Sequence, residues 1–167
     1  ALIHTKSVER YLSPDASKTI IADSPGLHFG KNFWKKFTPL IMRDFDHSFR
    51  EIGLIIDPND GMVAEKVGPV FDVLKDWNIG ILQGTQDIIM SSVFGNISPV
   101  EHEVNVLGPR GLLAKADGRS NVSVWVSPSK MHTFYLLPQS AEEIYDFQGL
   151  NALDFLQHLS MKSSRPF

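Results

Sequence analysis

The sequence predicts an α+β fold in which an antiparallel sheet carries packed helices on one face. Residues 53–93 read as a strand, a turn, a helix and two strands, which is the order of a ferredoxin-like βαββ unit. Residues 95–138 hold short apolar segments separated by glycine and proline, the pattern of an antiparallel meander. Helical apolar spacing then returns over residues 140–159.

The chain length of 167 residues fits one compact domain spanning 1–167, with a division into 1–95 and 96–167 as the alternative. Apolar residues make up 43% of the chain and include eleven Phe and three Trp, enough for a sizeable core. We therefore expect an independently folded domain or a recognition domain of a larger assembly.

Composition excludes several classes of function. The net charge of −3 leaves no basic excess for binding nucleic acid or an anionic membrane surface. The absence of cysteine excludes disulfides, thiol catalysis and cysteine-ligated metals. No apolar run approaches the ~20 residues that span a bilayer, so we expect a cytoplasmic protein with no membrane contact. The aromatics among Lys31, Lys35 and Lys36 are expected to be buried, with the lysines in solvent.

The clearest helix follows Thr38, a favoured N-cap, and Pro39, a favoured first helical residue. Its apolar positions recur at helical spacing and end at Gly53, a favoured C-terminal cap. These positions are Ile41, Phe45, Phe49 and Ile52.

Strand and helix patterns fill the rest of the chain. The helical stripe over residues 62–77 is interrupted by Gly68-Pro69, so it either kinks there or restarts at Pro69. The expected helices near the C-terminus are 140–147 and 151–159. The expected strands are 19–22, 53–57, 79–82, 87–94, 103–107, 112–115, 122–126 and 133–137.

Three polar clusters are candidate reactive sites. Asp44, Asp46 and His47 fit a solvent-facing helix better than a metal site, because Asp46 reaches Arg50 and His47 reaches Glu51 at i,i+4. His102, between Glu101 and Glu103, is expected to be a surface histidine. Arg110, in a Gly-Pro-Arg-Gly segment, is expected in a hairpin turn, with anion binding as the alternative. We expect no metal site and no cofactor.

The predicted ligand site is the turn that leaves the first strand of 53–93 and enters a helix. Its amides can meet a ligand carboxylate, while its side chains can receive an ammonium group. Gln83 and Thr85 on the next strand can add neutral hydrogen bonds. The turn contributes Asp57, Asn59, Asp60, Gly61 and Met62; an ordinary βα turn capped by Asp60 is the alternative.

The segments Gly61–Val70, 73–74, 78–81 and 83–85 together resemble the ACT domain family, in particular its aspartokinase-like and arginine-sensor-like members. The resemblance covers about 40 residues and implies a βαββαβ fold. It also implies pairing of domains edge to edge or side by side, hence a homodimer, and binding of an amino-acid-like effector at the 57–62 turn. Residues 95–138 depart from the pattern, because no second helix is evident there.

The leading functional hypothesis is a non-catalytic regulatory or interaction domain that binds a small molecule or a protein partner. One alternative is a hydrolase or lyase that uses His102 with Asp44 or His47. Another is a recognition and packing domain of a larger multidomain protein. No motif assembles a nucleophile, a base and an orienting group, so the non-catalytic hypothesis is favoured over the enzymatic one.

Overall fold

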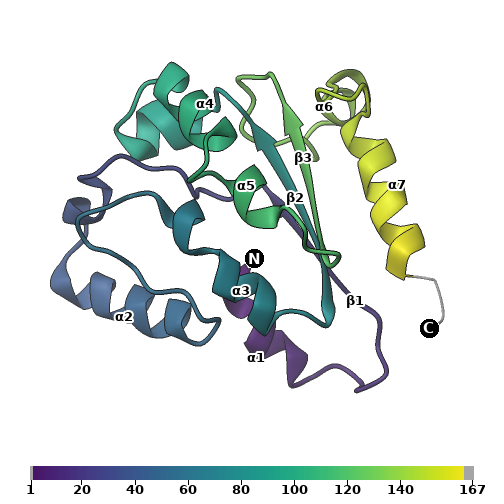
Figure 1. The fold of residues 1–167 in the computed structure, drawn as a ribbon, viewed down its shortest axis with the longest axis horizontal. Helices are drawn as coiled ribbons and strands as arrows, with labels where there is room; N and C mark the ends of the chain where they lie inside the picture. Colours follow the sequence, from purple (N-terminus) through teal and green to yellow (C-terminus); the bar gives the residue numbers. More distant parts are fainter. Residues whose placement is uncertain (1, 164–167) are drawn as a thin grey trace.

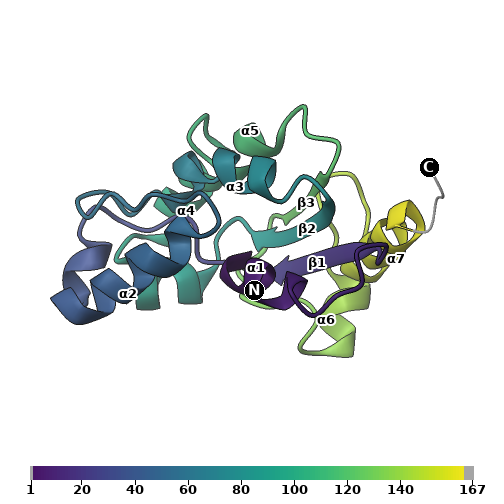
Figure 2. The same cartoon turned by 90° about the horizontal axis from the view of Figure 1, so that it is seen from below.

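The computed structural model describes residues 2–163 and contains a three-stranded sheet between layers of helices (Figures 1 and 2). The strands are β1 (Lys18–Asp23), β2 (Trp77–Gly84) and β3 (Val122–Ser127), in the order β1-β2-β3. Both pairs are parallel, with Ile79 opposite Ile20 and Val122. The sheet is therefore open and parallel, with β2 at its centre.

Helices fill the connections. Before β1 lie η1 (Leu2–His4) and α1 (Thr5–Glu9). Between β1 and β2 lie η2 (Phe33–Lys36), α2 (Pro39–Arg50), η3 (Val63–Lys66) and α3 (Gly68–Val73). Between β2 and β3 lie the π-helix η4 (Ile89–Gly95), α4 (Pro99–Leu107) and α5 (Leu112–Ala116). After β3 come α6 (Pro138–Glu143) and α7 (Ala152–Ser163).

The alternation of side chains along β2 places a core on each face of the sheet. Ile79 and Ile81 join a core with Phe71 and Leu74 from the α3 region. Leu82 points to the other face and joins a second core with Leu159 of α7. Figure 2 shows α3 and α5 on one side of the sheet and α6 on the other. Both faces of β2 are buried, which is the usual state of a central parallel strand.

Gly80 explains how closely α7 approaches the sheet. A Cβ atom at this position would collide with the Leu159 side chain and lie 3.5 Å from the ring of Phe155. The absence of a side chain on this face of β2 therefore lets α7 lie directly over the strand.

The expected antiparallel sheet with helices on one face is wrong. Each pair of neighbouring strands is joined by a long helical connection, and such connections produce parallel pairing. The strands expected at 19–22, 79–82 and 122–126 are confirmed as β1, β2 and β3. The helix beginning at Thr38-Pro39 is confirmed as α2, and the stripe over 62–77 does divide at Gly68-Pro69 into η3 and α3.

The outer strands of the expected βαββ unit are absent for local reasons. Gly53 has a φ of +78° and ends α2, and Leu54 N–H still donates to Phe49 O at 2.9 Å, so 53–57 is an irregular segment. Asp87 Oδ1 accepts the Met90 N–H at 2.9 Å and thereby begins a helical turn where a strand was expected at 87–94.

The predictions of three further strands in the meander are also wrong. Ser98 Oγ accepts the Glu101 N–H at 3.1 Å and Pro99 takes the first helical position, so residues 103–107 belong to α4. Residues 112–115 belong to α5, and 133–137 is irregular. Glycine and proline mark helix ends in this region, whereas the prediction interpreted them as hairpin turns.

Replacing Leu159 with Ala should lower the free energy of unfolding by about 2–5 kcal/mol, because it opens a void between α7 and the sheet. Leu159 is 2% exposed, whereas Leu153 on the same helix is 36% exposed. Leu153→Ala is the matched control and should cost much less. Urea denaturation of both variants tests this, and equal losses would contradict the assigned packing of α7.

Candidate functional site

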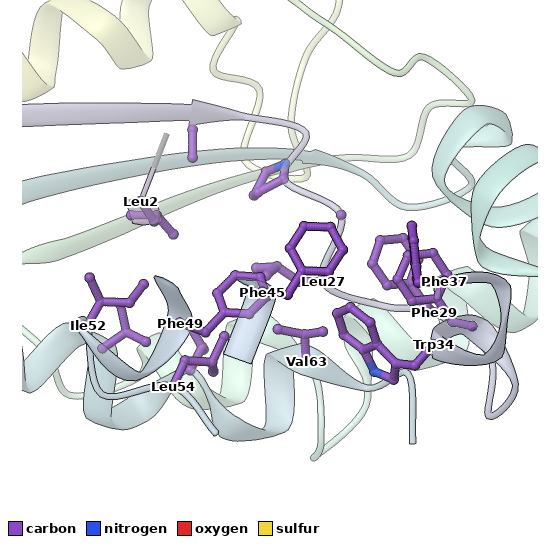
Figure 3. A pocket seen from close by; sticks show the side chains of 16 residues that line it. Leu2, Leu27, Phe29, Trp34, Phe37, Phe45, Phe49, Ile52, Leu54 and Val63 are labelled. Atoms are coloured by element: carbon purple, nitrogen blue, oxygen red, sulfur yellow. The ribbon is translucent and has the colours of Figure 1, made fainter. Parts of the chain in front are cut away.

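A cavity of about 300 Å³ lies between the carboxyl end of β1, η2, α2 and the η3–α3 segment (Figure 3). Sixteen residues line it, and none of their side chains carries a charge. The only polar side-chain group among them is the indole N–H of Trp34, which donates to the Asp60 carbonyl at 3.0 Å. The side chains that line the cavity are therefore almost entirely apolar.

The aromatic segment after β1 forms one end of the cavity. The Phe29 and Phe33 rings are stacked with centroids 3.7 Å apart, and Trp34 meets Phe33 edge-on at 4.8 Å. Phe33 and Trp34 are buried, while the interleaved lysines are exposed, as the sequence predicted. Lys36 donates to the Phe94 carbonyl, which ties this segment to the end of η4.

Helix α2 forms a second wall with its apolar stripe. Thr38 Oγ1 accepts the Ile41 N–H at 3.4 Å, and Pro39 opens the helix. Phe45 and Phe49 project into the cavity, as Figure 3 shows, and their rings are 5.9 Å apart. None of the twelve residues of α2 is fully buried, so this helix is held by partly exposed contacts.

The outer face of α2 carries the acidic cluster noted in the sequence. Asp46 and Arg50 form an ion pair at 2.7 Å, and His47 lies 3.8 Å from Glu51. These are the predicted i,i+4 pairs of a solvent-facing surface. No group of three or more His, Asp or Glu residues that could hold a metal ion occurs within residues 2–163.

The 57–62 turn borders the cavity and is largely saturated by its own hydrogen bonds. Asp57 Oδ1 accepts the Asn59 N–H at 2.9 Å, and Asp60 Oδ1 accepts the Met62 N–H at 3.0 Å. The Asp60 N–H donates to the Asp57 carbonyl. The amides expected to receive a ligand carboxylate thus already have partners, and the cavity against this turn measures only about 10 Å³, room for about one water.

Gly61 holds the turn against the segment after β1. Its carbonyl accepts the Phe29 N–H at 3.0 Å, and a Cβ atom here would lie 2.6 Å from the Phe29 carbonyl oxygen. Met62 is buried, whereas Asp57 and Asn59 are exposed. The turn therefore lies behind the cavity wall, with Trp34 between it and the cavity.

The structure does not bring Gln83 and Thr85 to this turn. Both are buried at the carboxyl end of β2. Gln83 Nε2 donates to the Gly84 carbonyl at 3.1 Å, and Thr85 Oγ1 donates to Glu103 at 2.8 Å. Within residues 2–163 no hydrogen bond joins either residue to the turn. The seven-residue ligand site remains a prediction. Its five turn residues and the two residues Gln83 and Thr85 lie in different environments.

Arg110 occupies a surface position between two acidic residues. Its guanidinium donates to Asp60 and, at 2.6 Å, to Glu65. The hydrogen bond from Arg110 lowers the pKa of Glu65 below its ordinary value. Both carboxylates compete with any external anion, so the alternative reading of this loop as an anion site gains no support.

Two histidines are buried beside the carboxyl end of β2. His102 belongs to α4 and its Nδ1 lies 2.7 Å from the Thr85 carbonyl, so the expectation of a surface histidine is wrong. The His28 ring lies 5.5 Å from the His102 ring and accepts the Leu112 N–H at Nε2. His28 Nδ1 is buried and lacks a partner among the described groups. Burial lowers the pKa of both imidazoles, that of His28 to about 3.

A second pair of polar side chains lies at the same edge of the sheet. No pattern in the sequence indicated this pair. His132, in the segment after β3, has its Nδ1 2.9 Å from Oδ2 of Asp87, which follows β2. Asp87 is fully buried, and the His132 side chain is 27% exposed. Only the parallel pairing of β2 and β3 brings these positions together, and nothing in the spacing of 45 residues could have indicated it.

The carboxyl end of β1 adds Asp23, the last residue of the strand, and Ser24, which follows it. Asp23 Oδ2 accepts the N–H groups of Phe134 and Tyr135, at 2.9 and 3.0 Å. Ser24 has a φ of +53° and its hydroxyl donates to Asp23 Oδ1 at 3.3 Å. A serine with positive φ directly after a strand resembles a nucleophile elbow, but an elbow leads straight into a helix, whereas residues 25–30 are irregular. Ser24 is also 3% exposed and engaged by its own neighbour.

Comparisons with protein-family models, curated proteins and solved structures found no match. The resemblance to the ACT domain family therefore stays a prediction, and the observed alternation of single strands with helices is not its βαββαβ order. No helix within residues 2–163 is long and apolar enough to cross a membrane.

Replacing Gly61 with Ala should lower the free energy of unfolding by about 1–3 kcal/mol, because the new methyl group meets backbone atoms that cannot move aside. Gly68→Ala is the matched control. Its nearest neighbour is the flexible Arg119 guanidinium at 3.4 Å, so the change should be nearly neutral or slightly stabilising. Thermal melts of both variants provide the measurement, and an unaffected Gly61→Ala protein would contradict the close approach.

The buried neutral His28 should make stability fall in mild acid. The unfolded chain binds a proton near pH 6.5 and the folded chain only near pH 3, so the free energy of unfolding decreases as pH falls through this interval. The slope from this residue is up to about 1.4 kcal/mol per pH unit. His28→Gln, which keeps an acceptor for Leu112, should flatten the profile, whereas the exposed His158→Gln should not. Identical slopes in all three proteins would refute the assignment.

Proposed function

We propose that this protein binds a small apolar molecule in the cavity under α2. The observation that carries the proposal is a cavity of about 300 Å³ without one charged side chain in its wall. Small-molecule sites begin at about this volume, and an apolar cavity of about 150 Å³ already holds benzene. The proposal retains the small-molecule hypothesis from the sequence but moves the ligand from the 57–62 turn to the interior.

The wall selects against a zwitterionic ligand. An ammonium or carboxylate group in the cavity would lose its water and find no side-chain partner, since the Trp34 N–H is occupied by Asp60. An apolar ligand has no charged group to desolvate. Its binding is stabilised by about 25 cal/mol for each Å² of apolar surface removed from water. Hydrocarbon chains and unsubstituted aromatic rings therefore suit the cavity better than free amino acids.

Helix α2 supplies a route into the cavity. None of its residues is fully buried, and none belongs to the sheet, so an outward movement of α2 would leave the pairing of the three strands intact. Phe45 and Phe49 would move with it and uncover the interior. The 57–62 turn, joined to the wall through Trp34, would respond to occupancy without contacting the ligand.

Binding can be measured with 1-aminoanthracene, an apolar fluorophore, and with octanol and arginine as competitors. We expect saturable fluorescence enhancement, displacement by octanol and none by arginine. Val63→Phe places a ring in the cavity and should weaken probe binding about tenfold or more, since it occupies the ligand's volume.

Val104→Phe is the matched control, because Val104 is 65% exposed on α4 and lies outside the cavity wall. It should bind the probe as the unaltered protein does. Equal binding by both variants, or displacement by arginine in preference to octanol, would refute an apolar ligand in this cavity.

A further inference from the structure

The Asp87–His132 pair has the geometry of an oriented general base. We propose that it activates a water molecule for hydrolysis of a carboxylic ester at the carboxyl edge of the sheet. Asp87 Oδ2 lies 2.9 Å from His132 Nδ1, and Asp87 Oδ1 accepts the Met90 N–H, also at 2.9 Å. Both carboxylate oxygens are thus fixed before any substrate arrives.

This arrangement determines which imidazole nitrogen is basic. A buried carboxylate accepts hydrogen bonds, so His132 Nδ1 carries the proton and Nε2 keeps its lone pair. Among the described residues no group bonds to Nε2, and the side chain is 27% exposed. The free nitrogen can therefore reach a water molecule, as the base of an Asp–His pair does in hydrolases.

The pair lies where open parallel sheets bind their substrates, beyond the carboxyl ends of neighbouring strands. Two backbone hydrogen bonds hold its supporting segments together: Gln86 N–H to the Ser129 carbonyl at 3.0 Å, and Ile88 N–H to the Lys130 carbonyl at 3.3 Å. The separation of Asp87 and His132 is consequently fixed by the main chain on both sides.

The proposed reaction is a direct hydrolysis. His132 Nε2 takes a proton from water as the water oxygen forms a bond to the ester carbonyl carbon. The bond between that carbon and the alkoxy oxygen then breaks, and the imidazolium returns its proton to the departing alcohol. A carboxylic acid and an alcohol are released, and no oxidant, reductant or second substrate is consumed.

The apolar cavity indicates the acyl group, and this part of the inference rests on the proposed function. Gly26 lines the cavity, and a Cβ atom there would lie 2.8 Å from the Met90 sulfur. Met90 in turn donates its N–H to Asp87. Met90 therefore lies between the cavity wall at Gly26 and the Asp87 carboxylate, and the hydrocarbon chain of the ester would extend past it into the cavity.

The test compares hydrolysis of p-nitrophenyl octanoate and p-nitrophenyl acetate by the full chain. We expect faster turnover of octanoate and a loss of about 100-fold or more in His132→Gln, the range typical of a general base. His158→Gln, which removes an exposed histidine from α7, should leave the rate unchanged. Added imidazole should partly restore a His132→Ala variant.

Asp87→Asn tests the positioning role with a readout that simple loss of structure would not give. An amide in place of the carboxylate donates to Nδ1, so ¹⁵N NMR of His132 should show the proton moved to Nε2 while hydrolysis is lost. If His132→Gln retains hydrolysis, the Asp87–His132 pair is not the base. If the protein binds 1-aminoanthracene but hydrolyses neither ester above the buffer rate, the hydrolase inference fails while the proposed binding function stands. Equal turnover of the two esters overturns the use of the cavity for the acyl chain.

Discussion

The double burial of β2 is the constraint on which the rest of the structure depends. With a parallel partner on each edge and a core on each face, β2 buries every residue except Asn78, which is partly exposed. Its neighbours must be reached by long helical connections, and those connections supply α3 and α5 on one face before α7 closes the other. The same arrangement sends all three strands toward one edge, where segments distant in sequence converge.

Much of the fold could be read from local signals. The apolar runs of the three strands, the Thr38-Pro39 start of α2 and the break at Gly68-Pro69 all act through residues close in sequence, and all are present. Strand direction was misjudged because a short apolar segment looks the same in a parallel and an antiparallel pair. Ser98-Pro99 and Asp87 are helix-starting signals that were interpreted as turn and strand residues.

The candidate site was harder to predict, because it depends on tertiary contacts. The aromatic residues of the cavity wall are recognisable as core residues, yet no pattern distinguishes a filled core from one that encloses a cavity. His102, between two glutamates, was expected on the surface, whereas α4 turns its side chain into the interior. Asp87 and His132 became a pair only through the pairing of β2 with β3.

The shallow burial of α2 has a kinetic consequence. Because none of its residues is fully buried, α2 can separate locally from the rest of the fold at a smaller cost than β2, which is packed on both faces. Amides of α2 would therefore exchange with solvent well before those of β2.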